Sequence, residues 1–179
     1  MAVIGLARKL GQRNPRPLRI LGDIAYVPLT RGMVAMIDAA DAELVGQMTW
    51  SATSTGYARA AYQQEDKSTK MYLMHRLITG ALPGQHVDHI DGDGLNNTRA
   101  NLRICSRSEN LINRGPQANN KTGFKGVSLC RQTGRYRAIL TVSGEKFRAG
   151  RFDTPEQAAR AYDELAKAKC GDFARLNFP

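Results

Sequence analysis

Short alternations of apolar and polar positions fill the first part of the chain, which is typical of strands in a small sheet. The run from Val34 to Ile37 is the clearest of them. Directly after it, Asp38 is placed to cap a short helix that continues through Val45. The pattern predicts a β-rich unit with Trp50 as a core anchor. Its further strands are predicted near Trp50, at 56–62 and at 70–74.

In the middle of the chain, the apolar positions mark two strands separated by a long polar loop. Val87 and Ile90 flank the first strand, and Leu102 and Ile104 alternate as a second strand requires. Residues 91–94 (Asp-Gly-Asp-Gly) between them are strong turn sequence.

A helix is predicted after the second of these strands. Ser106, with Glu109 three residues later, makes a capping box, so the helix starts at Arg107. The predicted order is therefore strand, loop, strand, helix.

In the last part of the chain, the pattern predicts three strands, at 123–129, 135–142 and 145–152. A helix is predicted after Thr154. Thr154 suits an N-cap, Pro155 the first helical position, and Gln157 completes a capping box. Alternation gives the second and third strands one basic and one apolar face. The apolar face is formed by Tyr136, Ala138, Leu140, Val142, Phe147 and Ala149, and an apolar helix stripe of Ala158, Ala161, Tyr162 and Leu165 covers it.

The fold class is predicted as α+β: a small β-rich N-terminal unit, a central strand–strand–helix motif, and a C-terminal three-stranded antiparallel sheet packed on one helix. Residues 115–122 are polar and begin with Gly and Pro, so we predict a linker there. The predicted parts are a basic flexible arm at 1–20, the β-rich unit at 21–74, the central module at 75–114, the linker at 115–122 and the C-terminal domain at 123–179.

Charge points to the class of partner. Lys and Arg number 26 against 16 acids, and the excess lies in residues 1–20 and 121–179. Such an excess favours a phosphate backbone, because each basic contact releases condensed counterions. No apolar run is long enough to cross a bilayer, so we expect no membrane partner.

The three cysteines are far apart and show neither a disulfide framework nor a paired zinc motif. We therefore expect a cytoplasmic protein, in the bacterial host cytosol if the chain is phage-encoded.

The central module carries residues suited to phosphodiester cleavage, which needs a base and a cation. His89 can be the base, since a neutral imidazole is available near pH 7. Asp88 supplies a hard anionic oxygen, and Asn110 can add an amide oxygen. A site with two protein oxygens, completed by waters and the substrate phosphate, suits one hard divalent cation better than zinc. We expect Mg²⁺, with Mn²⁺ as the alternative. Asn101 can fix the loop by bonding backbone groups.

This segment resembles the HNH endonuclease family with its ββα-metal motif, most closely the branch of phage and intron homing endonucleases. The spacing matches: Asn101 follows His89 by 12 residues (101 − 89), and Asn110 follows Asn101 by 9 (110 − 101). The resemblance implies that Asp88 and Asn110 bind the metal, that His89 is the general base, and that Asn101 is a structural clamp. The third position of the motif is Asn rather than His, which weakens a zinc interpretation.

Other polar residues near this motif receive no catalytic role. Asn96 and Asn97 are interpreted as turn formers, and Asp91 and Asp93 as loop acids. For His75, helix packing or a phosphate contact is expected. His86 has no assigned role.

The C-terminal module resembles the plant Apetala/ethylene-response-factor DNA-binding domain, in residues 126–127, 150–154, 158–163 and 176–179. The resemblance implies that the basic sheet face enters a groove of double-stranded DNA. Ser128 and Cys130 replace base-reading arginines, Thr133 stands about where a Trp is usual, and Ile139 replaces a Glu, so the plant target sequence is not implied. The positions matching the DNA-facing side are Lys125, Ser128, Arg135, Arg137, Thr141, Lys146 and Arg148, with Cys130.

Two functional hypotheses remain. The leading one is a site-preferring, homing-type, metal-dependent DNA endonuclease that nicks as a monomer, with a dimer as the alternative. The other is a non-catalytic DNA-binding transcriptional regulator, for which the C-terminal module alone would be enough. An RNA-binding protein is a weaker alternative, since the chain has no run of exposed aromatics for stacking bases.

Overall fold

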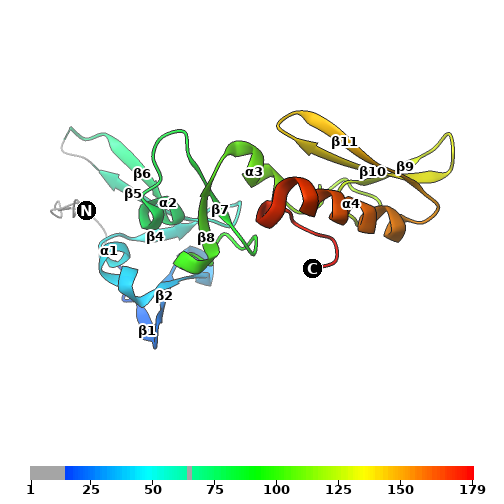
Figure 1. The fold of residues 1–179 in the computed structure, drawn as a ribbon. Coiled ribbons are helices and arrows are strands. Elements are labelled where there is room, and N and C mark those ends of the chain that lie inside the picture. The colour runs from blue at the N-terminus through cyan, green and yellow to red at the C-terminus, as the bar shows by residue number, and fades with distance from the viewer. Residues whose placement is uncertain (1–14, 64–65) are drawn as a thin grey trace. The chain divides into compact units, whose positions relative to one another are not determined.

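The computed structural model describes residues 15–63 and 66–179 (Figure 1). The fold is α+β, with several small antiparallel sheets and a C-terminal helix. The chain divides into two compact units, and the boundary falls between Ile104 and Cys105. None of the helices in the described part of the chain is long and apolar enough to cross a membrane.

The first unit begins with an antiparallel sheet in the order β1-β2-β3. Its strands are β1 (Arg19–Leu21), β2 (Ile24–Pro28) and β3 (Val34–Asp38). The strand predicted at 34–37 is confirmed. Most of the basic arm expected over 1–20 lies outside the described residues, and its last two residues, Arg19 and Ile20, belong to β1.

A second antiparallel sheet has the order β4-β5-β6. Its strands β4 (Trp50–Ala52), β5 (Ala58–Gln63) and β6 (Thr69–Leu73) confirm the three strands predicted in this region.

The helix expected directly after Asp38 is displaced. A 3-10 turn over Ala39–Asp41 comes first, and α1 spans Ala42–Gly46. The prediction that Asp38 caps the helix is wrong, because its Oδ2 accepts a hydrogen bond from the backbone N–H of Arg99 at 2.7 Å. The Asp38 carboxylate therefore bonds a residue 61 positions along the chain and makes no side-chain capping bond to the local turn.

One hydrophobic core serves the whole first unit. Trp50 is buried in it, as predicted, and its indole N–H donates to the Val45 carbonyl at 2.9 Å. Helix α2 (Met74–Thr79) adds Met74 and Ile78 to the same core. The core therefore continues past residue 74 into the region that carries the central motif.

The central motif contains the predicted elements. β7 (His86–His89) and β8 (Leu102–Cys105) form a two-stranded sheet, and α3 spans Arg107–Ile112. The capping box of Ser106 and Glu109 is confirmed, with both reciprocal bonds present. Helix α3 belongs to the second unit, where Ser108 Oγ bonds both the backbone N–H and the hydroxyl of Ser143.

The second unit is a three-stranded antiparallel sheet, β11-β10-β9, with α4 packed on it (Figure 1). The elements are β9 (Val127–Cys130), β10 (Arg135–Val142), β11 (Glu145–Phe152) and α4 (Pro155–Cys170). The capping box at Thr154 is confirmed. The buried helix residues are Ala158, Ala159, Tyr162, Asp163 and Ala166, so the stripe is rotated slightly from the prediction, and Ala161 and Leu165 are only half-buried.

The first strand of this sheet begins four residues later than predicted, at Val127 instead of Gly123. Gly126 has a φ of +74°, and a Cβ there would lie 2.1 Å from the ring of Tyr162. The chain must therefore turn closely over α4 at Gly126, and only glycine fits this approach. The strand can start only after this turn.

Candidate active site and DNA-binding surface

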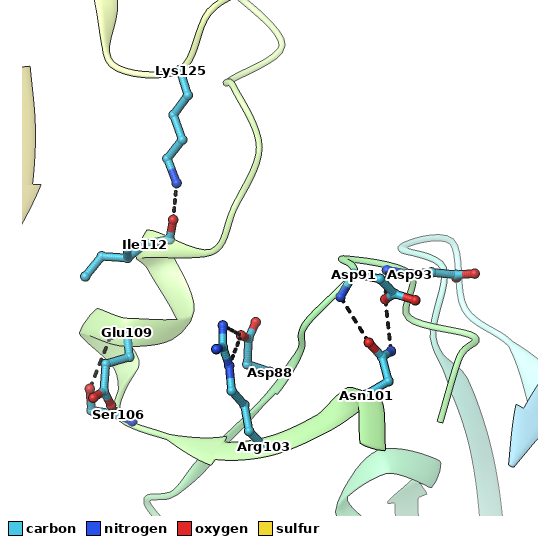
Figure 2. A network of polar contacts seen from close by, with 9 residues as sticks. All are labelled: Asp88, Asp91, Asp93, Asn101, Arg103, Ser106, Glu109, Ile112 and Lys125. Atoms are coloured by element: carbon cyan, nitrogen blue, oxygen red, sulfur yellow. Dashed lines mark hydrogen bonds and ion pairs between the residues drawn. The ribbon is translucent and has the colours of Figure 1, made fainter. Parts of the chain in front are cut away.

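The loop between β7 and β8 is closed by the side chain of Asn101 (Figure 2). Its Nδ2 donates to Asp91 Oδ1 at 2.9 Å and to the Asn96 carbonyl at 2.8 Å, and its Oδ1 accepts from the Asp91 backbone N–H at 3.0 Å. Its own carbonyl accepts from the backbone N–H of Ile90 at 2.9 Å. Asn101 thus ties the residues just after β7 to the start of β8.

Asp91 is the acceptor at the centre of this loop. Burial acts to raise the pKa of its carboxyl, but hydrogen bonds from the Asp93 backbone, Asn96 and Asn101 outweigh burial and leave the pKa below its ordinary value. The bonds from Asp93 N and Asn96 Nδ2 are 2.8 and 2.7 Å long. An ionised Asp91 therefore stabilises the loop shape, consistent with its interpretation as a loop acid.

His89 lies buried at the end of β7 with polar and aromatic neighbours. Its Nε2 is 3.4 Å from Asn97 Oδ1, and its ring centroid is 5.7 Å from that of Tyr57 and 5.1 Å from that of His75. Burial lowers the pKa of His89, against the opposing effects of Asn97 and nearby carboxylates. The ring is therefore neutral near pH 7, the state that a general base requires.

His75 is a buried residue on α2, which favours helix packing over a phosphate contact. Burial, then the nearby His89 and Arg76, lower the pKa of His75 to about 4. Its Nδ1 has no hydrogen-bond partner within residues 15–63 and 66–179. Neutral His75 packs edge-on against both His89 and Tyr57. His86, by contrast, is only half-buried on β7.

Asp88 forms an ion pair that the sequence analysis missed (Figure 2). Arg103 on β8 donates to Asp88 Oδ2 from Nε at 2.9 Å and from Nη2 at 2.7 Å. The side chains are 5% exposed for Asp88 and 17% for Arg103. An arginine on the neighbouring predicted strand, between the apolar positions 102 and 104, was the available hint.

The donor set suits a hard cation better than zinc. Among the described residues, no group of three or more His, Cys, Asp or Glu side chains could hold a metal ion. Asp88 offers a buried carboxylate oxygen, the type of ligand that hard divalent cations prefer. Asn110 lies half-buried on α3 in the second unit, and its place beside Asp88 stays a prediction.

The second unit presents a basic sheet face opposite α4. Arg135, Arg137, Thr141, Lys146 and Arg148 are all exposed, and Ser128 is half-buried. Arg135 is paired with Asp153 at 2.8 Å. Lys125 Nζ donates to the carbonyl of Ile112 at the end of α3. Cys130 is buried, so its side chain is not offered to a ligand.

Arg151 also lies on this face and was missed by the sequence analysis. Strict alternation puts it on the apolar side, with Phe147 and Ala149. The register shifts between Ala138 and Ile139, which pair with Gly150 and Arg148. This irregularity moves Arg151 directly opposite Arg137 on the exposed face.

A buried aspartate–histidine pair ends β7 in the first unit, and the second unit carries a basic sheet face. The family model for HNH endonuclease matches residues 72–112, and that for the AP2 domain matches residues 122–172. No solved structure matches the chain.

Similar proteins cover different parts of the chain. The mimivirus protein named Uncharacterized HNH endonuclease L560 is 27% identical over 94% of this chain and 89% of its own length. Protein 3.8 of Escherichia phage T7 is 30% identical over 66% of this chain and 98% of its own length. Dehydration-responsive element-binding protein 2A of Arabidopsis thaliana is 43% identical over 36% of this chain and 19% of its own.

The chain belongs to the HNH endonuclease family and carries an AP2 domain. It is accordingly a DNA endonuclease, a phosphodiester hydrolase with a DNA-binding module. The resemblances on which the sequence analysis relied are confirmed.

Proposed function

We propose that this endonuclease is metal-dependent, site-preferring and of the homing type, and that it nicks one strand of duplex DNA. The observation that carries the proposal is the burial of two consecutive residues at the end of β7, the carboxylate of Asp88 and the imidazole of His89. A buried carboxylate next to a neutral imidazole supports the two needs of phosphodiester hydrolysis, a cation site and a base.

His89 is proposed as the general base. Its imidazole takes one proton from a water molecule while the water oxygen bonds to phosphorus and the bond from phosphorus to the leaving oxygen breaks. Burial helps because it keeps the imidazole unprotonated. Asn101 does not touch the reacting atoms in this proposal. It keeps the loop closed over the end of β7.

Asp88 is proposed as the carboxylate that holds one divalent cation, Mg²⁺ or alternatively Mn²⁺. The motif spacing adds Asn110 as an amide ligand. The cation, when bound, would stabilise negative charge on the phosphate and on the leaving oxygen. Arg103 orients the Asp88 carboxylate, because its guanidinium donates twice to the same carboxylate oxygen.

The basic sheet face is proposed to place the duplex. Arg135, Arg137, Lys146 and Arg148 supply cationic contacts, and Ser128 and Thr141 are neutral hydrogen-bonding positions between them. Lys125, which bonds the Ile112 carbonyl through one of its three N–H groups, supplies a further cation. Phosphate contacts position a protein and carry no sequence information themselves. Site preference therefore depends on how this face sits in a groove.

The expected organisation is part of the same proposal: an arm at 1–20, a β-rich unit at 21–74, the nuclease module at 75–114, a linker at 115–122 and the DNA-binding domain at 123–179. One active site per chain favours a nick from a monomer. Two cuts would need a second chain or a second event.

Supercoiled plasmid tests the proposal. Wild-type protein is expected to convert it to the open circle with Mg²⁺ or Mn²⁺ and to leave it intact in EDTA. Cleavage in EDTA would reject metal dependence. Linear product that forms as early as the open circle, at protein concentrations where the chain is monomeric, would reject nicking.

A further inference from the structure

Residues 114–122, which connect α3 to the sheet of the second unit, are held in place at both ends. At the far end, Asn120 Nδ2 donates to the Phe124 carbonyl at 2.7 Å. The Asn120 Oδ1 accepts from two backbone N–H groups that follow it in the chain, at 2.8 and 3.0 Å. At the near end, Lys125 reaches back to the carbonyl of Ile112 (Figure 2). The connecting segment therefore has a defined shape.

A groove of about 1230 Å³ is lined by this segment, by the end of α3 and by residues of β9 and β10. All of its lining residues belong to the second unit. Among the described residues that line it, none is Asp or Glu, and four are cations: Arg114, Lys121, Lys125 and Arg131. Three amide side chains of the connecting segment add further hydrogen-bonding groups. The groove therefore suits a ligand with several negative charges.

The size and the lining of the groove favour a polymer over a small molecule. Sites for small molecules span roughly 300 to 1,000 Å³ and are mostly apolar, with a few polar groups. This groove is larger and carries four cations, each of which could meet a separate phosphate. Leu111 and Leu129 also line it and are exposed, so apolar contact is available for the sugars between phosphates.

The groove is continuous with the basic sheet face. Ser128 and Thr141, which match DNA-facing positions of that face, also line the groove. The two family matches, however, leave residues 113–121 uncovered. Arg114 and Lys121 therefore belong neither to the nuclease motif nor to the AP2 domain, and the function of either module leaves their charge unexplained.

We propose that this groove binds the sugar-phosphate backbone of the duplex on which the sheet face docks, and that Arg114 and Lys121 each contact one phosphate. The segment 114–122 is then part of the DNA-binding surface and not only a connection between two modules. Phosphate contacts fix the register and orientation of a protein on the duplex. Because the segment follows α3 directly, phosphates held here also restrict where this helix lies on the DNA. The inference rests on the proposed docking of the sheet face, and it adds a second surface.

Binding of the full-length protein to a mixed-sequence duplex in EDTA, measured over a range of salt concentrations, tests the inference. Arg114→Ala and Lys121→Ala should each reduce the slope of log affinity against log salt by about 0.9, and the double variant by about 1.8. Arg114→Lys combined with Lys121→Arg keeps both charges and should keep the wild-type slope. Both positions are exposed, so every variant should melt at the wild-type temperature.

Lys167→Ala is the matched control, because it removes an exposed positive charge from the last turn of α4, away from the groove lining. Its slope should equal that of wild type. A wild-type slope for the double alanine variant would overturn the inference. Single-stranded DNA of the same sequence is the second ligand. A slope that falls for the single strand and not for the duplex would overturn the assignment to a duplex backbone.

Arg137→Ala in the same assay keeps the inference and the proposed function apart. If Arg137→Ala reduces the slope and the double alanine variant does not, the sheet face binds DNA and the inference about the groove fails. If the double alanine variant reduces the slope and Arg137→Ala does not, the phosphate contacts of the groove stand and the proposed docking of the sheet face fails. A reduced slope in both supports one continuous surface.

Discussion

The cross-strand arginines of the second unit give the sharpest quantitative prediction. Arg137 and Arg151 lie directly opposite each other on the exposed sheet face, across β10 and β11. If each contacts one phosphate, replacing it with alanine should reduce the slope of log affinity against log salt by about 0.9. The ratio of wild-type affinity to variant affinity should then fall by about 3.5-fold between 50 and 200 mM salt for a single variant. For the double variant it should fall by about 12-fold.

Fluorescence anisotropy with a mixed-sequence duplex in EDTA measures these slopes without cleavage. Lys167→Ala is the matched control, because it also removes one exposed positive charge, but from the last turn of α4. Like charges opposite each other in a sheet are mildly destabilising, so neither arginine variant should lower the melting temperature. A slope equal to that of wild type for Arg151→Ala would refute the placement of Arg151 on the DNA-facing side.

Three further predictions concern stability. Thr154→Ala should lower the unfolding free energy of the second unit by about 1 kcal/mol, because the Thr154 hydroxyl caps α4 through Gln157 N–H at 3.2 Å; an unchanged denaturant midpoint would contradict this. Since the pKa of His75 is lowered to about 4, the unfolded state binds its proton first, and stability is lost as pH falls from 6.5 toward 4. In His75→Phe, the loss of unfolding free energy between pH 6.5 and pH 4 should be smaller than in wild type by up to about 3 kcal/mol, as measured by melting at a series of pH values. The same pH profile in both proteins would reject a buried neutral His75. Arg103→Leu should lower the unfolding free energy measured in EDTA by about 3 kcal/mol, because it leaves the Asp88 carboxylate buried without its ion pair. Mg²⁺ should restore part of this free energy by binding the folded state. An unchanged unfolding free energy in EDTA would argue against the ion pair.

Local patterns predicted most of the secondary structure. Alternation located the strands of both units, and the capping boxes at Ser106 and Thr154 fixed where α3 and α4 begin. These features depend on residues within three or four positions of each other, so the sequence carries them directly. The prediction for Asp38 failed for the opposite reason, since its partner is Arg99, far along the chain.

The site was predicted less completely because its supporting contacts join distant segments. Asp88 and His89 were identified from their order and spacing, but Arg103 and Asn97 meet them only when the loop between β7 and β8 closes. Asn97 looked like an ordinary turn residue because turn formers and buried hydrogen-bond acceptors are the same residue types.

Arg151 was hidden for another reason. Simple alternation predicts its side chain on the apolar face, and only a register shift of the strand pair reverses this. Bulges depend on how two strands match each other, which one strand's sequence does not show.

Relaxation of supercoiled plasmid by wild type and by His89→Ala, at equal DNA occupancy in Mg²⁺, tests the central claim most directly. The variant removes the proposed base and leaves the sheet face of the second unit intact, so it should bind the plasmid as wild type does and not relax it. Nicking by wild type alone is the predicted result. Nicking by His89→Ala at the wild-type rate would contradict the assignment of His89 as the catalytic base.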